Sequence, residues 1–260
     1  MTRRFRPTWN CEMAGFFPNA AIEREFAKQL LKVAKNSGGI LNRYIRAQGG
    51  NLYVADLESL IIALKNYEFQ LDDWAQKICE KILNKIERQN AAAWKSAAVG
   101  QSAAGIALSA SAARLAGAAL LREQVNLIKS LPRHMAERAQ SAALSAMAGG
   151  RRASELSAIL QSAAGVEAAR AMLIARTEIA KANATLTRAR AEAVGVTHYV
   201  WRTMGDAQVR PAHDELDGEI FEFGKAPYVE GEGYHHPGEF PNCRCYAEPI
   251  FTGKSVENEK

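Results

Sequence analysis

An alanine-rich stretch constrains the fold of this 260-residue chain more than any other feature. Residues 91–150 contain 20 alanines in 60 positions. Alanine has the highest intrinsic helix propensity, and its small side chain lets neighbouring helices approach closely. We therefore expect long, closely packed helices, paired or bundled, which break near Pro132 and end at Gly149-Gly150.

Amphipathic helices are predicted on both sides of this stretch. Apolar residues three and four positions apart predict a helix from Asn19 to about Lys35, which the run Ser37-Gly38-Gly39 should end. The same periodicity predicts further helices over residues 40–47, 56–64, 72–98, 153–164 and 166–193.

The pattern changes after Gly195. Residues 197–203, 220–223 and 244–251 are rich in β-branched and aromatic side chains, which favour strands. The predicted fold class is therefore mainly α, with long Ala-rich helices in a bundle or hairpin, followed by a small C-terminal α+β domain.

Composition predicts four parts along the chain. Residues 1–19 combine arginines and aromatics in an extended arm, 20–150 are helical, 151–252 form the small domain and 253–260 a disordered tail. The arm offers four aromatic anchors for a partner: Phe5, Trp9, Phe16 and Phe17.

Targeting signals and a disulfide framework are not predicted. The first 30 residues lack the pattern of a signal peptide, and the four cysteines are few and unevenly placed, so we expect a reducing, cytoplasmic site of synthesis. The least polar stretch, Ala91–Leu121, contains Lys95, Gln101 and Arg114, and we predict that it does not span a membrane.

The charge distribution has two parts. Residues 1–200 contain 27 Lys and Arg against 16 Asp and Glu, a net charge of +11, whereas residues 201–260 contain 6 against 12, a net charge of −6. A basic body is compatible with a polyanionic partner, so a DNA-binding module on the basic helices is one candidate function.

Potential metal ligands gather at the C-terminal end. Four of the five histidines and two of the four cysteines follow residue 195. Cys243 and Cys245 share one face of an extended segment, and with His213 and either His236 or His235 they form a Cys2His2 set suited to tetrahedral Zn²⁺.

Two alternatives to a structural zinc site remain open from the residues alone. A hydrogen-bonded cluster around Asp206, Arg210 and Arg244 would order the same loops without metal. A zinc-dependent hydrolase or nuclease would use His213 and the two cysteines with Asp217 or Glu219 as base. The spacing matches neither metalloproteases nor nucleobase deaminases, and we predict no catalytic residues.

One combination of motifs resembles a known family. The motif residues are Arg176, Glu178, Trp201, Asp206, Arg210, His213, Gly218 and the run from His236 to Cys245, which includes Arg244. This arrangement, over roughly residues 155–250, resembles the Mu F-like head morphogenesis domain of tailed bacteriophages. Many relatives have a Cys-x2-Cys pair where this chain has Arg210 to His213, so only His213 remains as a ligand from that pair.

The resemblance implies a minor head protein without catalytic turnover, present in several copies per virion. It would lie in the head interior or at the portal vertex, and in the host cytoplasm during assembly. Its implied partners are the portal protein and also the major capsid or scaffold protein. We expect residues 20–150 to contact the portal or the capsid, because a long Ala-rich helix exposes a flat face that a partner can cover. The resemblance also implies a role in DNA packaging or ejection, with direct contact to DNA. It implies no association with a membrane in the assembled state.

Overall fold

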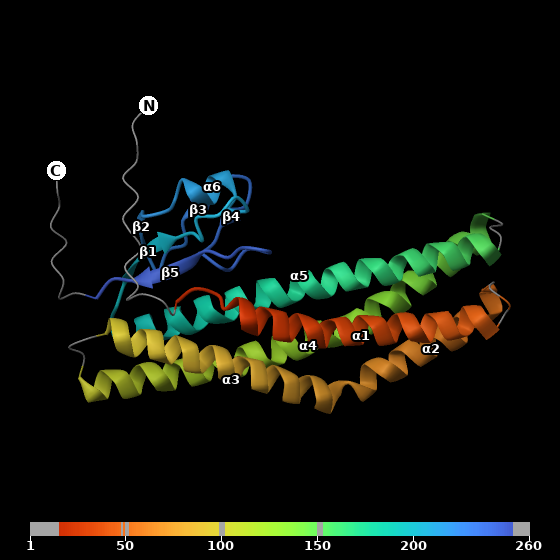
Figure 1. The fold of residues 1–260 in the computed structure, drawn as a ribbon, viewed down its shortest axis with the longest axis horizontal. Coiled ribbons are helices and arrows are strands. Elements are labelled where there is room, and N and C mark those ends of the chain that lie inside the picture. The colour runs from red at the N-terminus through yellow and green to blue at the C-terminus, as the bar shows by residue number, and fades with distance from the viewer. Residues whose placement is uncertain (1–15, 48, 50–51, 99–101, 150–152, 252–260) are drawn as a thin grey trace. The chain divides into compact units, whose positions relative to one another are not determined.

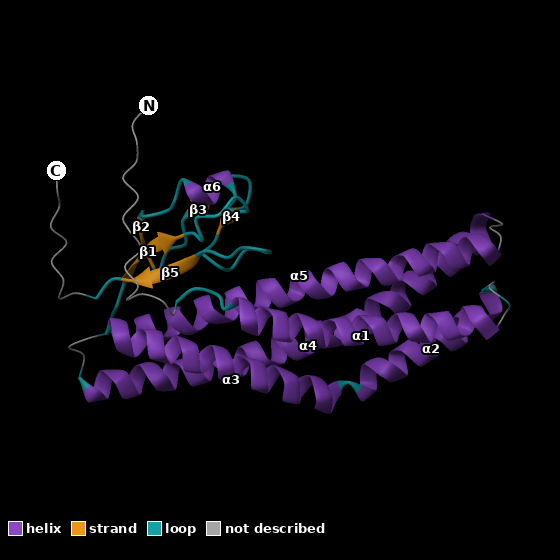
Figure 2. Ribbon diagram, in the orientation of Figure 1, coloured by secondary structure: helices purple, strands orange, loops and turns teal. Residues whose placement is uncertain are grey.

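The computed structural model describes residues 16–47, 49, 52–98, 102–149 and 153–251 (Figures 1 and 2). The described residues form six helices and five strands, so the fold is mainly α with a small C-terminal α+β part, as predicted. The helices are α1 (Ala20–Ala47), α2 (Val54–Gln70), α3 (Asp72–Ala97), α4 (Ala103–Gly149), α5 (Ala153–Ala193) and α6 (Pro211–Asp214). The strands are β1 (His198–Arg202), β2 (Ile220–Glu222), β3 (Tyr228–Val229), β4 (Gly233–Tyr234) and β5 (Tyr246–Pro249).

The chain forms two compact units, each assembled from segments that are distant in sequence. Of the described residues, those within 19–85 and 117–179 form the bundle unit. The site unit is formed by residues 16–18, 86–98, 102–116 and 180–251. Residues 1–15 of the predicted arm and the predicted tail 253–260 lie outside the described part, and the division at residue 150 remains a prediction.

The bundle unit has a core of aliphatic side chains from α1, α2, α4 and α5. Buried leucines and isoleucines alternate with small residues, which allows the helices to pack closely. Core members are Ile40, Leu41, Ile45, Leu52, Leu57, Leu60, Leu64, Met135, Ala136, Ala139, Ala142, Leu156 and Leu160.

The predicted helix end at Ser37-Gly38-Gly39 is wrong, because α1 continues through it to Ala47. Ser37 is fully buried and its hydroxyl donates to the Val33 carbonyl, so its polar group is satisfied within the helix. A Cβ at Gly38 would lie 3.4 Å from that of Ala164 on α5. Small residues here let two helices approach, and this packing outweighs their low helix propensity.

Two other predicted interruptions are also absent. Helix α4 passes through Pro132, and α5 is one helix across Gly165, although breaks were expected at both places. Buried Leu131 and Met135 on either side of the proline anchor the helix, which offsets the lost backbone hydrogen bond. Glycine costs only about 1 kcal/mol inside a helix, so long flanking helical segments override it.

The predicted strands are confirmed in the site unit. Strand β1 lies between β2 and β5 in an antiparallel three-stranded sheet, with Val200 opposite Ile220 and Trp201 opposite Ala247. Strands β3 and β4 form a separate antiparallel hairpin. The sheet therefore holds the segment that begins just after Cys245 against β1.

The core of the site unit is rich in aromatics, and Trp201, Tyr199, Trp94 and Phe16 are almost completely buried. Phe16 packs within this core, and its carbonyl accepts a hydrogen bond from Asn183. Phe17 is partly buried and packs against the same core, with its ring 6.3 Å from that of Tyr246. Two of the four predicted partner anchors therefore contact the chain itself, whereas the sequence predicted that they contact a partner.

A buried polar network joins α3 and α5 within the site unit. Asn90 donates to Asn183 Oδ1 at 3.1 Å and to Thr187 Oγ1 at 2.7 Å, and Arg190 donates to Asn90 Oδ1 at 2.9 Å. Arg190 also pairs with Glu87 at 2.6 Å. The charge of Arg190 is thus paired, and most polar atoms of the network have hydrogen-bond partners. These contacts fix the register of the two helices.

Two helices are long and apolar enough to cross a membrane, by length and composition alone. They are Ala103–Ala146 within α4 and Glu155–Ala193 within α5. Buried core helices meet the same criterion, but here only 17% and 33% of the most apolar windows are buried. Both helices therefore carry apolar surface that other parts of the described chain do not cover.

Candidate metal centre

A tight turn brings the two C-terminal cysteines into position. Gly238 has φ +87°, and a Cβ there would lie 3.1 Å from the Cys245 carbonyl oxygen, so only glycine fits. Asn242 has φ +63°, a conformation that asparagine tolerates better than most residues. The chain then enters β5 with Cys243 and Cys245 both buried.

A single helical turn presents the histidine. Helix α6 begins with Pro211 at its first turn, and the backbone amide of His213 donates to the Arg210 carbonyl at 3.0 Å. Proline is favoured there because its fixed φ suits a helix start. His213 is 1% exposed, so its ring points into the site unit.

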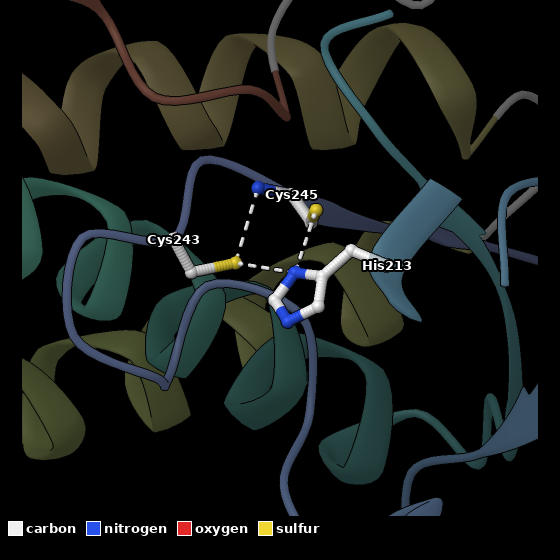
Figure 3. Close-up of side chains that lie close together, drawn as sticks. All are labelled: His213, Cys243 and Cys245. Carbon is white, nitrogen blue, oxygen red and sulfur yellow. Dashed lines mark hydrogen bonds between the residues drawn. The ribbon is translucent and has the colours of Figure 1, made fainter. Parts of the chain in front are cut away.

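The imidazole of His213 meets both sulfurs through one nitrogen. Its Nδ1 lies 3.5 Å from Cys243 Sγ and 3.4 Å from Cys245 Sγ (Figure 3). The backbone amide of Cys245 also donates to Cys243 Sγ at 3.4 Å. All three ligand atoms lie within 4.8 Å of one another, so the predicted convergence of these residues is observed.

The other ring nitrogen of His213 is held by a carboxylate. His213 Nε2 lies 2.8 Å from Glu232 Oε2, and His235 Nε2 lies 3.0 Å from the same oxygen. Glu232 is in the turn between β3 and β4. Because a carboxylate accepts only, the proton of a neutral His213 sits on Nε2 and the Nδ1 lone pair faces the sulfurs.

The electrostatics favour a charged form of this group. A hydrogen bond from Cys245, and then one from the protonated imidazole of His213, lower the pKa of the Cys243 thiol to about 4. Burial opposes protonation of His213, but its bonds to Cys243 and Glu232 outweigh that effect and raise its pKa. The pKa of Cys245 is raised by the neighbouring Cys243 and by burial. The site therefore stabilises at least one thiolate, the form that binds metals.

His236 does not join the cluster, contrary to its prediction as the fourth ligand. Its Nδ1 lies 2.9 Å from the Tyr199 hydroxyl, and its backbone amide donates to Glu239. In an extended segment neighbouring side chains point to opposite faces, so only His235 can approach His213. Their ring centroids are 5.6 Å apart.

The alternative cluster of Asp206, Arg210 and Arg244 exists beside the cysteines rather than instead of them. Arg244 makes two hydrogen bonds to Asp206, of 2.8 and 2.6 Å. Arg210 donates to the Pro241 carbonyl at 2.8 Å and pairs with Glu232 at 3.2 Å. These contacts fasten the loops that carry the three candidate ligands.

The remaining motif residues have structural roles. Trp201 is fully buried, and its ring lies 5.5 Å from that of His213 in an edge arrangement. Gly218 has φ +88° and its amide donates to the Trp201 carbonyl. Arg176 and Glu178 belong to the bundle unit, where Arg176 pairs with Glu23 at 3.1 Å.

Sequence reasoning missed Glu232. It lies three residues before His235 in an irregular turn, and no periodicity indicates that its carboxylate faces His213. Only the position of the β3–β4 hairpin reveals the contact.

Comparison with known proteins identifies the region that carries this site. Residues 137–248 match the family described as Phage Mu protein F like protein. A Haemophilus influenzae protein, described as uncharacterized, is 38% identical over 133 residues, which are 51% of this chain and 29% of the relative. The matched part of the chain thus spans less than a third of that relative. No solved structure matches.

Proposed function

We propose that this Mu F-like phage protein is a minor head protein with a structural and assembly role at the portal vertex. The observation that carries the proposal is the family match over residues 137–248, which confirms the resemblance drawn from the motifs and includes the whole candidate site. Presence in the virion and roles in DNA packaging or ejection belong to the same proposal.

An uncovered stripe on α5 supports a role in assembly. Ile159, Ser162, Val166, Ala169 and Leu173 lie at spacings of three and four and are all exposed. The opposite face of this helix is in the bundle core, so this part of α5 is apolar on two sides. Such a helix needs a covering partner, and contiguous exposed apolar surface is typical of an interaction site.

Helix α4 offers a similar surface within the region predicted to contact the portal. Leu108 and Leu115 are seven residues apart and are 54% and 76% exposed. Arg114 is the only charged residue from 103 to 121. A partner here would present apolar side chains rather than a complementary charge.

Co-expression with the portal and major capsid proteins of the same phage tests the proposal. We expect the tagged chain to capture the portal protein, and Val166→Glu with Leu173→Glu to reduce capture at least tenfold. Gln161→Glu, an exposed position on α5 outside the stripe, serves as the matched control. Absence of portal and capsid proteins, with the chain recovered in the membrane fraction, would contradict the proposal.

We also propose that His213, Cys243 and Cys245 hold Zn²⁺ as a structural staple of the site unit. The donor set fits, because zinc favours thiolate sulfur and imidazole nitrogen. Bond lengths of about 2.0 and 2.3 Å give a tetrahedral N-to-S edge of about 3.5 Å. The two observed Nδ1-to-Sγ distances, 3.5 and 3.4 Å, agree with this edge. Elemental analysis of the purified full chain should find about one zinc per chain, lost in Cys243→Ser.

The hydrolase alternative receives less support from the geometry. Asp217, one of the two bases considered, accepts a hydrogen bond from the Thr203 backbone amide at 2.8 Å. The carboxylate that does reach the cluster, Glu232, is bonded to two histidines and Arg210. It is therefore placed to orient His213 rather than to accept a proton from water.

A further inference from the structure

The candidate metal centre contains a space next to its three ligands. His213, Cys243 and Cys245 line one cavity of about 20 Å³. Its other lining residues are Met204, Gln208, Val209, Arg210, Asn242 and Arg244. A volume of this size accommodates one water molecule and little more.

Among the His, Cys, Asp and Glu side chains of the described residues, only His213, Cys243 and Cys245 converge around the sulfurs, and no fourth joins them. Glu232 and His235 are on the far side of the His213 ring, where Glu232 binds His213 Nε2 and His235 binds the same Glu232 oxygen. The two arginines at the cavity carry no lone pair for a metal. Arg244 is bonded to Asp206, and Arg210 to the Pro241 carbonyl.

We infer that metal bound here has an open fourth coordination position, filled by water and accessible to one small monodentate ligand. This inference rests on the zinc proposal above. Zinc prefers four ligands, and three protein ligands plus an exchangeable water distinguish an open site from a site closed by four protein ligands. Two thiolates and a neutral imidazole already balance the charge of Zn²⁺, so a neutral water completes the site.

Glu232 is the positioning residue of this centre. Its bond to Nε2 keeps Nδ1 unprotonated and aimed at the metal, the role that carboxylates have beside metal-bound histidines. Glu232→Gln should weaken metal affinity about 10- to 100-fold without changing the ligand set. The absorption spectrum of the metal-loaded variant should therefore match that of the unmodified protein.

Cobalt substitution of the full chain tests the open position. Co²⁺ should give ligand-field bands of a tetrahedral site and charge-transfer absorption from two thiolates. Cyanide, added stepwise under anaerobic conditions, should shift the ligand-field bands saturably while cobalt stays bound. His236→Asn is the control that leaves the spectrum unchanged, and His213→Asn should abolish it.

The outcomes separate the two proposals. Cobalt binding with no response to cyanide overturns the open position and leaves the zinc proposal intact. If the charge-transfer absorption of the Cys11→Ser variant is a third lower than that of the unmodified chain, Cys11 supplies a third thiolate ligand. This result also overturns the open position. Failure of the unmodified chain to bind cobalt or zinc overturns both, but leaves portal capture as an independent test of the head role.

Discussion

At the scale of single residues, backbone conformation decides whether the candidate ligands can meet. Gly238 and Gly231 both have positive φ, +87° and +75°. They differ in surroundings, because a Cβ at Gly238 would press on the carbonyls of Cys245 and Ala180, whereas a Cβ at Gly231 meets nothing within 4 Å. Substitution of Gly231 therefore introduces backbone strain alone, whereas substitution of Gly238 introduces backbone strain and a steric clash.

Gly238→Ala should destabilise the chain more than Gly231→Ala. The strain of positive φ costs about 1–2 kcal/mol in either variant, and the Gly238 variant must in addition displace the Cys245 backbone. Chemical denaturation measures the difference in the free energy of unfolding. Equal losses in the two variants would show that the close approach near Cys245 has no energetic consequence.

Trp201→Ala should cost about 3–5 kcal/mol, the range for removing a large buried aromatic side chain. Trp201 is 0% exposed and contacts the rings of His213, Phe221 and His235. Ile220→Ala, at a half-exposed position on the neighbouring strand, is the control and should cost less than 1 kcal/mol. Thermal denaturation of both variants tests this, and similar midpoints would contradict a core role for Trp201.

Glu167 is a buried carboxylate whose charge is poorly compensated. Its side chain is 0% exposed, and Arg138 and Arg170 approach only to 3.8 and 3.9 Å. Neither carboxylate oxygen has a hydrogen-bond partner within the described residues. Burial raises its pKa, and the two arginines offset this only in part.

Glu167→Gln should therefore stabilise the chain at neutral pH by about 1 kcal/mol, because it removes a buried charge. With a folded pKa above the unfolded value, the folded state binds the proton more tightly, so stability falls as pH rises through the folded pKa. The variant should lose this dependence between the ordinary glutamate pKa of about 4.3 and neutrality. Glu58→Gln, at an exposed position on α2 that does not contribute to the Glu167 shift, should show neither effect.

At the scale of elements, the long helices tolerate residues that normally end a helix. Gly165 is exposed in α5, and an added Cβ there meets nothing within 4 Å. Its presence therefore reflects no packing requirement in the described chain, in contrast to Gly38 beside Ala164.

Gly165→Ala should raise the free energy of unfolding by about 0.5–1 kcal/mol, the difference in helix propensity between the two residues. Gly195 lies at the end of α5 with φ +74°, so Gly195→Ala should lower the free energy of unfolding. Urea denaturation distinguishes them. A loss of stability in the Gly165 variant would indicate that the helix does not continue through this position in solution.

At the scale of the whole molecule, helix content and site integrity should respond differently to metal removal. The helices of the bundle unit are held by an aliphatic core without any candidate ligand. In the site unit, the loops after Tyr234 have little regular structure and depend on hydrogen bonds, aromatic packing and the three candidate ligands.

A chelator should lower the thermal midpoint of the purified full chain by about 5 °C or more, which corresponds to roughly 2 kcal/mol for a protein of this size. The helical circular dichroism at 25 °C should remain nearly unchanged, because most of it comes from α1 to α5. Cys243→Ser should abolish the chelator effect, whereas Cys79→Ser, outside the site, should preserve it. A midpoint that is insensitive to chelator in the unmodified chain would contradict a stabilising metal.

The sequence by itself determined the fold class, the strands of the small sheet and the identity of three converging residues. Alanine content and runs of β-branched and aromatic residues are local properties, and a Cys-x-Cys pair in an extended segment shares a face wherever it lies. The burial of Trp201 also follows from composition, since a small unit must use its largest aromatic as core.

Only the tertiary structure decided where helices continue, which histidine approaches the sulfurs and that Glu232 orients His213. Ser37-Gly38 and Pro132 remain helical because buried neighbours on both sides compensate for their low propensity. Adjacent histidines cannot be ranked from sequence, because the choice between His235 and His236 depends on which face of the segment meets α6. Contacts between residues 19 or more positions apart, such as His213 and Glu232, arise from the packing of loops and not from any local pattern.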